Sequence, residues 1–385
     1  MTLRERLETV LQESSDDAAA RARAAFPEAV ADRPVVLYGA GGAGRRALRA
    51  LRAAGTEPVA FADRSAGGDV DGVPALSPAD AAARYGRDAA FVVTVVNPHV
   101  PHRSIADALR EAGCERVVPF AHLAWHVGRD LLPYFAIDLP QGVLGDRDDV
   151  LRAFDVFGDE ASREEYVDQV EFRLTGDPTP LRPHLPLAEQ YLAPDLLTWR
   201  ADEVFIDAGA FDGDTIRGVL EHSDAFGRII ALEPDPSNLE RLGGYVAGLP
   251  EDVRERIDLE PYAVAAQRGT ARFAGSGLAS AALSDEGDVE VQTAPLDEVV
   301  ADRHPTYVKL DVEGAEPDAL RGAARIIQGE RPVLAVCVYH AQRHLWSLPL
   351  QVEATADDYR LHLRRYEADF FQDVLYAVPA ERSAG

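Results

Sequence analysis

The chain has 385 residues, 46% of them hydrophobic, and its 65 acidic residues outnumber 39 basic ones to give a formal net charge of −26. This length predicts two domains. The negative charge argues against a protein that binds the phosphate backbone of nucleic acids, so we expect small-molecule ligands and no nucleic-acid partner. The first ten residues are charged, unlike a signal peptide, and no apolar run is long enough to span a bilayer. Both features predict a cytoplasmic protein without a membrane partner.

The first third of the chain alternates apolar runs with helical patterns. Residues 2–26 are expected to form one helix, whose apolar stripe docks on the chain's own core or on a second copy in a homodimer. The elements expected next are strands 34–38, 59–62, 91–96 and 117–120, with helices 45–54, 78–85 and 105–112 between them. Such alternation gives a parallel sheet, so residues 1–128 are predicted to form a small Rossmann-like domain.

A glycine-rich turn follows the first of these strands. Gly39, Gly41 and Gly44 match the pattern G-x-G-x-x-G between a strand and a helix, and the next strand ends at Asp63. These residues favour a second nucleotide site, and three interpretations stay open. The first is an NAD(P)-dependent oxidoreductase, although the absence of lysine here excludes the Tyr/Lys short-chain dehydrogenases. The second is a nucleotide-sugar-binding protein, because the domain resembles the N-terminal domains of some bacterial sugar acyltransferases. The third is a Rossmann unit kept for packing or dimerisation.

Residues 129–200 are predicted to connect two domains. Helical patterns cover 148–157 and 162–175, and a proline-rich, irregular stretch runs from 178 to 194. Such a segment is either a plain linker or a mobile lid that excludes water from a neighbouring site.

Residues 201–385 open on another strand, turn and helix. The apolar run Val204–Ile206 ends at Asp207, a turn with two glycines follows, and a helical pattern begins at Thr215. The glycines let the backbone approach a ligand, and the helix N-terminus presents free N–H groups. The next apolar run ends at Glu233, twenty positions past Gly213. A carboxylate at this place can accept hydrogen bonds from a ribose diol.

The rest of this region continues the alternation of strands and helices. We expect a helix capped by Ser237 and a strand over 257–263. The later elements expected are strands 307–311 and 333–339, a helix over 316–328, and a closing antiparallel pair over 359–366 and 373–378. The whole chain is therefore predicted to have an α/β fold.

Several blocks in this region resemble the FkbM family of methyltransferases. They read FIDAGAFDGDT, ALEPDPSNLERL, PLDEVV, YVKLDVEGAEPDALRGA, VCVYH and LWSLP, in the family's order over residues 187–379. The resemblance implies a class I methyltransferase fold, preceded here by the smaller Rossmann-like domain. It also implies a β-rich excursion over residues 272–291, where members of the family have an insertion. It also implies S-adenosylmethionine (SAM) as cofactor and methyl transfer to a hydroxyl oxygen of a sugar or secondary metabolite. The family often has an acidic residue shortly after the Tyr-His pair, where this chain has His344. A non-catalytic protein that uses both Rossmann units for binding is a further alternative.

The resemblance also implies site residues. The first turn would hold the methionine part of SAM, Glu233 its ribose, and the residues from Ala263 onward its adenine. The expected cofactor-binding set is Asp207, Gly209, Ala210, Phe211, Asp212, Gly213, Thr215, Glu233, Pro234, Ala263, Asp311 and Tyr191.

Two side chains are candidates for removing the acceptor proton. His340 follows the strand over 333–339, and partial burial would keep its imidazole neutral near pH 7, the form that accepts a proton. Asp311 is the next candidate, because it and Glu313 follow the strand that would face the methyl group. No metal is expected, since Asp311, His340 and His344 do not have a recognised ligand spacing.

Overall fold

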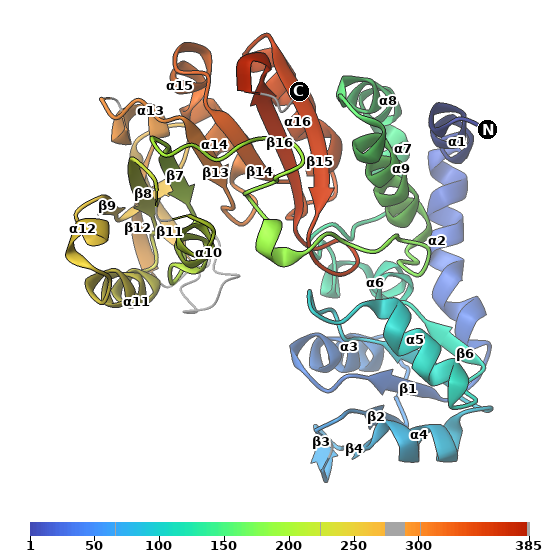
Figure 1. Cartoon of the computed structure of the whole chain (residues 1–385). Coiled ribbons are helices and arrows are strands. Elements are labelled where there is room, and N and C mark those ends of the chain that lie inside the picture. The colour runs from blue at the N-terminus through green and yellow to red at the C-terminus, as the bar shows by residue number, and fades with distance from the viewer. Residues whose placement is uncertain (66, 224, 274–288, 301, 383–385) are drawn as a thin grey trace.

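A computed structural model describes residues 1–65, 67–223, 225–273, 289–300 and 302–382. It contains two large β-sheets in separate parts of the molecule, with a group of helices beside them (Figure 1). The first sheet lies within residues 35–118 and the second within residues 204–379. Within the described ranges, no helix has both the length and the apolar character needed to cross a membrane.

The first sheet has the strand order β3-β4-β2-β1-β5-β6. Its strands are β1 (Val35–Tyr38), β2 (Ala60–Ala62), β3 (Asp69–Val70), β4 (Val73–Leu76), β5 (Ala90–Val93) and β6 (Arg116–Val118). Alternate residues of β1 belong to two apolar clusters, one on each face of the sheet. Burial on both faces explains the continuous apolar runs of β1 and β5. The expected parallel sheet is confirmed, and the short β3–β4 hairpin at its edge was not predicted.

Four helices accompany this sheet: α3 (Gly42–Ala53), α4 (Pro78–Tyr85), α5 (His102–Glu111) and α6 (Phe120–Val127). The helix α6 was not predicted, because Phe120 was assigned to the preceding strand. We call the first sheet together with α3–α6 the N-terminal unit.

The N-terminal segment forms two helices, so the prediction of one helix over 2–26 is wrong. α1 (Leu3–Val10) ends before a short turn, and the Ser14 side chain then caps α2 (Ser15–Val30) by accepting the N–H of Asp17. The apolar stripe continues across the turn, so periodicity alone did not show the break. This stripe packs within the chain, with α1 against the connecting helices and α2 against α6.

The connecting region contains α7 (Gln141–Gly145), α8 (Arg147–Val156) and α9 (Glu160–Thr175), which confirms the two helices expected there. The proline-rich stretch that follows contacts the second sheet, from its edge strand to strands inside it. Its Leu185 N–H donates to the carbonyl oxygen of Arg365 at 2.8 Å, and its Tyr191 N–H donates to the hydroxyl of Tyr376 at 2.9 Å. We call residues 178–203 the strap.

The second sheet has the strand order β15-β16-β14-β13-β7-β8-β9. Its strands are β7 (Val204–Ala208), β8 (Arg228–Leu232), β9 (Ile257–Glu260), β13 (Tyr307–Leu310), β14 (Val333–Cys337), β15 (Tyr359–Arg365) and β16 (Asp373–Pro379). β16 runs antiparallel to both of its neighbours, which confirms the expected closing pair. The chain starts at β7, winds outward to β9 and then returns to β13 on the other side. The carboxyl ends of β7 and β13 therefore form a switch point, where ligands of such sheets bind.

The helices of the second sheet are α10 (Asp214–His222), α11 (Pro236–Ala247), α12 (Glu251–Arg254), α13 (Leu296–Val299), α14 (Glu316–Gly322), α15 (Ala324–Gly329) and α16 (His344–Thr355). The cap of α11 is Asp235 and not Ser237, because the Asp235 carboxylate accepts the N–H of Ser237. The helix expected over 316–328 is divided at Ala323, next to a close backbone contact of Gly322. α16 was not predicted, since a proline lies inside it.

A small third sheet contains β10 (Tyr262–Val264), β12 (Val289–Ala294) and β11 (Gly269–Phe273), in this order. The strand expected over 257–263 is thus divided between β9 and β10, which belong to different sheets. β11 and β12 pair antiparallel, which confirms β-structure at both ends of the excursion expected over 272–291. Residues 274–288 of that excursion lie outside the described residues.

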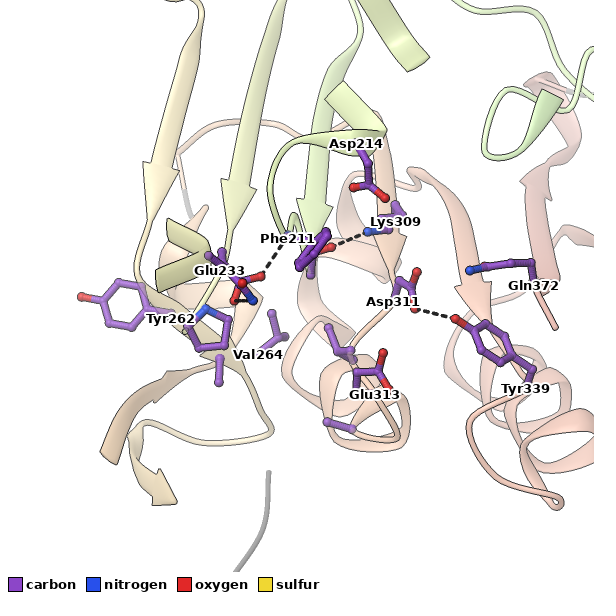
Figure 2. Close-up of a pocket in the computed structure, with 16 residues that line it drawn as sticks. Phe211, Asp214, Glu233, Tyr262, Val264, Lys309, Asp311, Glu313, Tyr339 and Gln372 are labelled. Atoms are coloured by element: carbon purple, nitrogen blue, oxygen red, sulfur yellow. Dashed lines mark hydrogen bonds between the residues drawn. The ribbon is translucent and has the colours of Figure 1, made fainter. Parts of the chain in front are cut away.

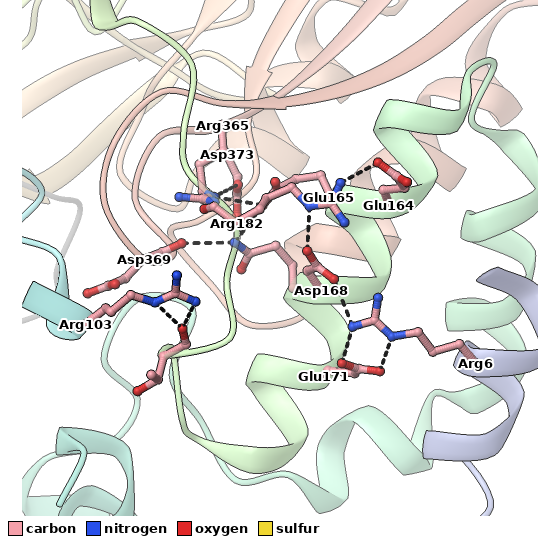
Figure 3. A network of polar contacts seen from close by, with 12 residues as sticks. Arg6, Arg103, Glu164, Glu165, Asp168, Glu171, Arg182, Arg365, Asp369 and Asp373 are labelled. Carbon is pink, nitrogen blue, oxygen red and sulfur yellow. Dashed lines mark hydrogen bonds and ion pairs between the residues drawn. The ribbon is translucent and has the colours of Figure 1, made fainter. Parts of the chain in front are cut away.

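A network of charged side chains links the N-terminal unit, the connecting helices and the second sheet (Figure 3). Arg365 of β15 donates to Glu165 of α9 at 2.8 Å, and both side chains are buried. The loop between β15 and β16 extends to the N-terminal unit, where both oxygens of Asp369 accept the N–H of His102 at 3.1 and 3.2 Å. Asp369 therefore caps the N-terminus of α5 from the other side of the interface.

Candidate active site

A cavity of about 840 Å³ opens at the carboxyl ends of β7, β8 and β13 (Figure 2). This is the switch point of the second sheet, where ligands of such sheets bind. Its wall residues are Gly209, Phe211, Asp214, Glu233, Pro234, Asn238, Tyr262, Ala263, Val264, Lys309, Asp311, Val312, Glu313, Ala315, Tyr339 and Gln372.

The turn after β7 presents bare backbone to this cavity. Gly209 has a φ of +83°, and a Cβ atom there would lie 1.9 Å from the carbonyl oxygen of Asp311. A residue with a side chain does not fit, so the loops after β7 and β13 meet without one. The helix α10 then begins at Asp214 without a side-chain cap. The N–H of Thr215 donates to the Asp214 carboxylate at 2.9 Å, and this carboxylate lines the cavity.

Glu233 stands at the end of β8, in the wall of the cavity. Its Oε2 accepts the N–H of Phe211 and its Oε1 accepts the N–H of Asp235, both at 2.9 Å. Burial raises the pKa of the Glu233 carboxyl, and these hydrogen bonds partly oppose the rise. The carboxylate therefore fixes the turn after β7 and also lines the cavity.

The only lysine of the sequence lies under the same turn. The strand register places Lys309 opposite Asp207, and the Lys309 Nζ donates to Asp207 Oδ1 at 2.9 Å and to the carbonyl oxygen of Gly209 at 2.7 Å. Burial raises the pKa of Asp207 to about 6 although Lys309 opposes the rise. Burial lowers the pKa of Lys309, but the carboxylates of Asp207 and Asp311 outweigh it and the net shift is upward. Because Lys309 also donates to the Gly209 carbonyl oxygen, this buried pair fixes the turn after β7.

Two tyrosines hold the carboxylate of Asp311. The hydroxyl of Tyr191 donates to Oδ2 at 2.9 Å, and that of Tyr339 donates to Oδ1 at 3.4 Å. Tyr191 comes from the strap, is 6% exposed and does not line the cavity. The strap therefore contributes to the site by positioning Asp311.

His340 is buried among carboxylates. Its Nδ1 lies 2.7 Å from Glu316 Oε1, and its Nε2 lies 3.3 Å from Asp311 Oδ1 and 3.7 Å from Glu313 Oε2. Burial lowers the pKa of the imidazole, but the three carboxylates outweigh burial and raise the pKa to about 9. The expectation of a neutral His340 near pH 7 is therefore wrong, because partial burial was considered without the acidic neighbours. At neutral pH His340 is a cation.

Glu313 lies where the cavity meets a second opening. It lines the cavity and also a cleft of about 960 Å³ between the second sheet and the N-terminal unit. Burial raises the pKa of its carboxyl to about 7, a rise that His340 opposes and Asp311 supports. Its backbone φ of +53° is unusual for a residue other than glycine, and such residues often occur at functional sites. A carboxylate with this pKa can accept a proton at neutral pH.

The comparison with family models identifies this region. Residues 207–370 match the model of the methyltransferase FkbM domain. Residues 207–370 are thus an FkbM methyltransferase domain. The chain is also similar to the crystal structure of methyltransferase FkbM from Methylobacillus flagellatus KT, with a TM-score of 0.78 and 21% identity over 98% of this chain and 99% of that chain. This likeness confirms the expected fold, a class I methyltransferase fold preceded by a smaller Rossmann-like unit.

A curated relative matches a shorter stretch. Ribosomal RNA small subunit methyltransferase H of Ralstonia pickettii (strain 12D) is 35% identical over 104 residues, which are 25% of this chain and 31% of the relative. The chain thus spans about a third of the length of that protein.

The FkbM domain brings together part of the expected cofactor-binding set. The residues of this set that line the cavity are Gly209, Phe211, Glu233, Pro234, Ala263 and Asp311. Those that do not line it are Asp207, Ala210, Asp212, Gly213, Thr215 and Tyr191. Val264 also lines the cavity, as expected for the residues that follow Ala263, and the wall residues not predicted are Asp214, Asn238, Tyr262, Lys309, Val312, Ala315, Tyr339 and Gln372. A charged residue inside an apolar strand was the available signal for Lys309, whereas Gln372 carries no comparable signal.

His344 replaces the acidic residue that is frequent in the FkbM family after the Tyr-His pair. Its Nδ1 lies 3.3 Å from Glu316 Oε2, so His344 and His340 approach the same buried carboxylate. In the described part of the chain, no group of three or more His, Cys, Asp or Glu side chains has an arrangement that could hold a metal ion.

The glycine turn of the N-terminal unit borders a separate cavity of about 530 Å³, which Gly39 and Asp63 help to line. Gly41 is the N-cap of α3, and Gly44 packs so closely that a Cβ there would lie 2.0 Å from the carbonyl oxygen of Gly39. The residues expected at a second nucleotide site are thus close together in space.

Proposed function

We propose that the chain is a SAM-dependent methyltransferase that methylates a hydroxyl oxygen of a small-molecule acceptor, a sugar or a secondary metabolite. The observation that carries this proposal is the position of Glu313. On one side of it lies the cavity of the FkbM domain, and on the other side lies the cleft toward the N-terminal unit. A cofactor in the cavity and an acceptor in the cleft would meet at this carboxylate.

The residues of the cavity fit SAM. The backbone of Gly209 offers a wall for the methionine part, Glu233 can accept hydrogen bonds from ribose hydroxyls, and residues 262–264 offer a wall for the adenine. The carboxylates of Asp214 and Asp311 suit the positive charges of the ligand. SAM would supply a methyl group on a positively charged sulfur, which an oxygen nucleophile can displace.

Glu313 is the base in this proposal. The acceptor hydroxyl would give its proton to Glu313 as its oxygen forms the bond to the methyl carbon and the carbon–sulfur bond breaks. Asp311 is a weaker candidate, because Tyr191 and Tyr339 already donate to its two oxygens. The cation of His340, fixed by Glu316, would orient the two carboxylates by charge. His340 is then a positioning residue and not the base.

An RNA acceptor is the other class that the comparisons raise, through the name of the partial relative. The net charge of −26 favours the small-molecule acceptor, because RNA phosphates would be repelled over most of the surface.

Calorimetric titration with S-adenosylhomocysteine tests the cofactor, and labelled methyl transfer from SAM to hydroxylated sugars or to total RNA tests the acceptor. We expect saturable binding and label in a sugar. No binding at millimolar concentration would contradict the cofactor assignment. Label in RNA, with none in any sugar, would contradict the acceptor class.

A further inference from the structure

The cleft between the N-terminal unit and the FkbM domain has walls from both. Gly42, Ala43 and Arg46 of α3 form one wall, and Glu313 and His340 form the opposite one, with the aromatic segment 133–135 between them. A ligand in this cleft would contact the glycine turn of the N-terminal unit and the proposed catalytic carboxylate at the same time.

The start of α3 is suited to an anion. This helix of 12 residues has Gly41 as N-cap and no side-chain cap, and within the described residues the N–H groups of Gly42 and Ala43 make no hydrogen bond. Free N–H groups and the helix dipole favour phosphate at such an end.

Arg46 adds a positive charge on the same wall. Its guanidinium lies 5.9 Å from the centroid of the Tyr134 ring and donates to the carbonyl oxygen of Asp130 at 3.4 Å. In the described part of the chain no carboxylate pairs with Arg46, although the protein as a whole is strongly acidic. An anion in the cleft would therefore find a cation that is not neutralised.

The opposite wall holds an unsatisfied polar group. The side chain of His340 is 2% exposed, and its Nε2 makes no hydrogen bond to any described residue, although it lies within ion-pair distance of Asp311 and Glu313, at 3.3 and 3.7 Å. Such buried groups are normally satisfied, so a polar group of a ligand is expected near it. This observation is independent of α3 and indicates a ligand in the same cleft.

A further cavity of about 530 Å³ lies on the other side of the glycine turn. Its walls include Tyr38, Val95, Val100 and Ile105, which give an apolar space suited to a flat ring, with Arg64 at its border. The order in space is therefore an apolar cavity, a turn with free N–H groups, and a polar cleft that ends at Glu313.

We propose that the acceptor is a nucleoside diphosphate that carries a hydroxylated group such as a sugar, and that it binds across both units. Its base would lie in the apolar cavity, its diphosphate on the N-terminus of α3 beside Arg46, and its sugar hydroxyl in the cleft at Glu313 and His340. This inference rests on the proposed function, since it names the acceptor class for the same site.

A pair of substitutions at Gly42 tests the anion site. A Cβ at this position has no atom within 4 Å, so Gly42→Ala and Gly42→Asp should both fold. Titration of each protein with ADP, UDP, GDP, dTDP, pyrophosphate and NADH should show binding of at least one nucleoside diphosphate. Gly42→Asp should lose it by about tenfold or more through charge repulsion, while Gly42→Ala keeps it. No binding to any probe, retention by Gly42→Asp, or NADH as the tightest ligand would overturn the proposal.

A second titration tests whether the ligand spans both units. Glu313→Gln should change the affinity for UDP-glucose, GDP-mannose, ADP-glucose or dTDP-glucose and leave that for the matching free diphosphate unchanged. If Glu313→Gln changed the affinity for the sugar nucleotide and for the free diphosphate by the same factor, the ligand would contact only the N-terminal unit. This result would overturn the proposal that the sugar lies at Glu313. Binding of S-adenosylhomocysteine should be unaffected by Gly42→Asp. If the wild-type protein did not bind S-adenosylhomocysteine, the proposed function would be contradicted. The result for the nucleoside diphosphates would still be valid, because it is measured separately.

Discussion

The imidazole Nδ1 of His340 and Oε1 of Glu316 lie 2.7 Å apart, and both side chains are buried. Because Nδ1 donates to a carboxylate, the other ring nitrogen carries its proton toward Asp311 and Glu313 when the ring is charged. The pair therefore places a positive charge between the cavity of the FkbM domain and the cleft toward the N-terminal unit. This arrangement has consequences for the pH dependence of the reaction.

The rate of methyl transfer should depend on two ionisations. Glu313, with a pKa raised to about 7, must be ionised to accept a proton, so kcat/KM should rise with pH through neutrality. His340, with a pKa raised to about 9, should lose its charge at higher pH, and the rate should then fall. Glu313→Gln should reduce transfer by roughly 10²–10⁴-fold and remove the rise. A rise that persists in this variant would exclude Glu313 as the base.

Replacing His340 by Gln should change the high-pH side of the dependence of rate on pH. The amide can still donate a hydrogen bond, but the positive charge is lost, so the fall near pH 9 should disappear and the rise should move to higher pH. Initial rates over pH 6 to 10 would show both changes, with S-adenosylhomocysteine affinity as the control for folding. An unchanged profile would remove His340 from the positioning role.

Loss of the Glu233 carboxylate should weaken cofactor binding. Glu233→Ala removes the acceptor for ribose hydroxyls and for the N–H of Phe211, at a cost of about 1–3 kcal/mol in the affinity for S-adenosylhomocysteine. The matched control is Asp212→Asn, a carboxylate of the same turn that does not line the cavity. Calorimetry should give a clear loss for the first variant and little change for the second. Equal affinities would rule out the ribose assignment.

The buried pair of Lys309 and Asp207 should contribute strongly to stability. Lys309→Met leaves a buried carboxylate without its partner and should cost about 3–5 kcal/mol of unfolding free energy, whereas Lys309→Met with Asp207→Asn should cost less. The exposed pair of Arg268 and Glu298 is the control, and Arg268→Met should change stability by less than about 1 kcal/mol. Urea unfolding followed by circular dichroism measures all three. A double variant less stable than Lys309→Met would contradict this account.

The hydrogen bond from the N-terminus of α5 to Asp369 should stabilise the N-terminal unit, and its removal should lower that stability. Asp369→Ala leaves the N–H of His102 without its acceptor and should cost about 1 kcal/mol. Asp357→Ala, a change at an exposed residue, serves as the control. Hydrogen exchange of α5 amides should increase in the first variant only. Unchanged exchange would show that the cap does not stabilise α5.

The sequence predicted the strands well and the site only in part, for physical reasons. Runs such as Val35–Tyr38 and Val333–Cys337 are apolar throughout because both faces of a parallel sheet are buried, and this pattern is visible without a structure. The pairing of Lys309 with Asp207 depends on β13 lying beside β7, which the order of elements along the chain does not show. The charge of His340 depends on Glu316, which lies 24 positions away. Local patterns show neither contact.

The loop between β15 and β16 carries two unrelated contacts close together. Asp369 caps α5 of the N-terminal unit, while Gln372 lines the cofactor cavity and accepts a hydrogen bond from Gln190 of the strap at 2.6 Å. The chain therefore is not modular at the border between its two Rossmann-like parts. A chimaera that joins this N-terminal unit to another FkbM domain at a single crossover would lose the partner of α5. Exchange of acceptor specificity by recombination would need three crossovers. One follows the N-terminal unit, and two flank residues 366–372, so that this loop and the N-terminal unit come from the same parent.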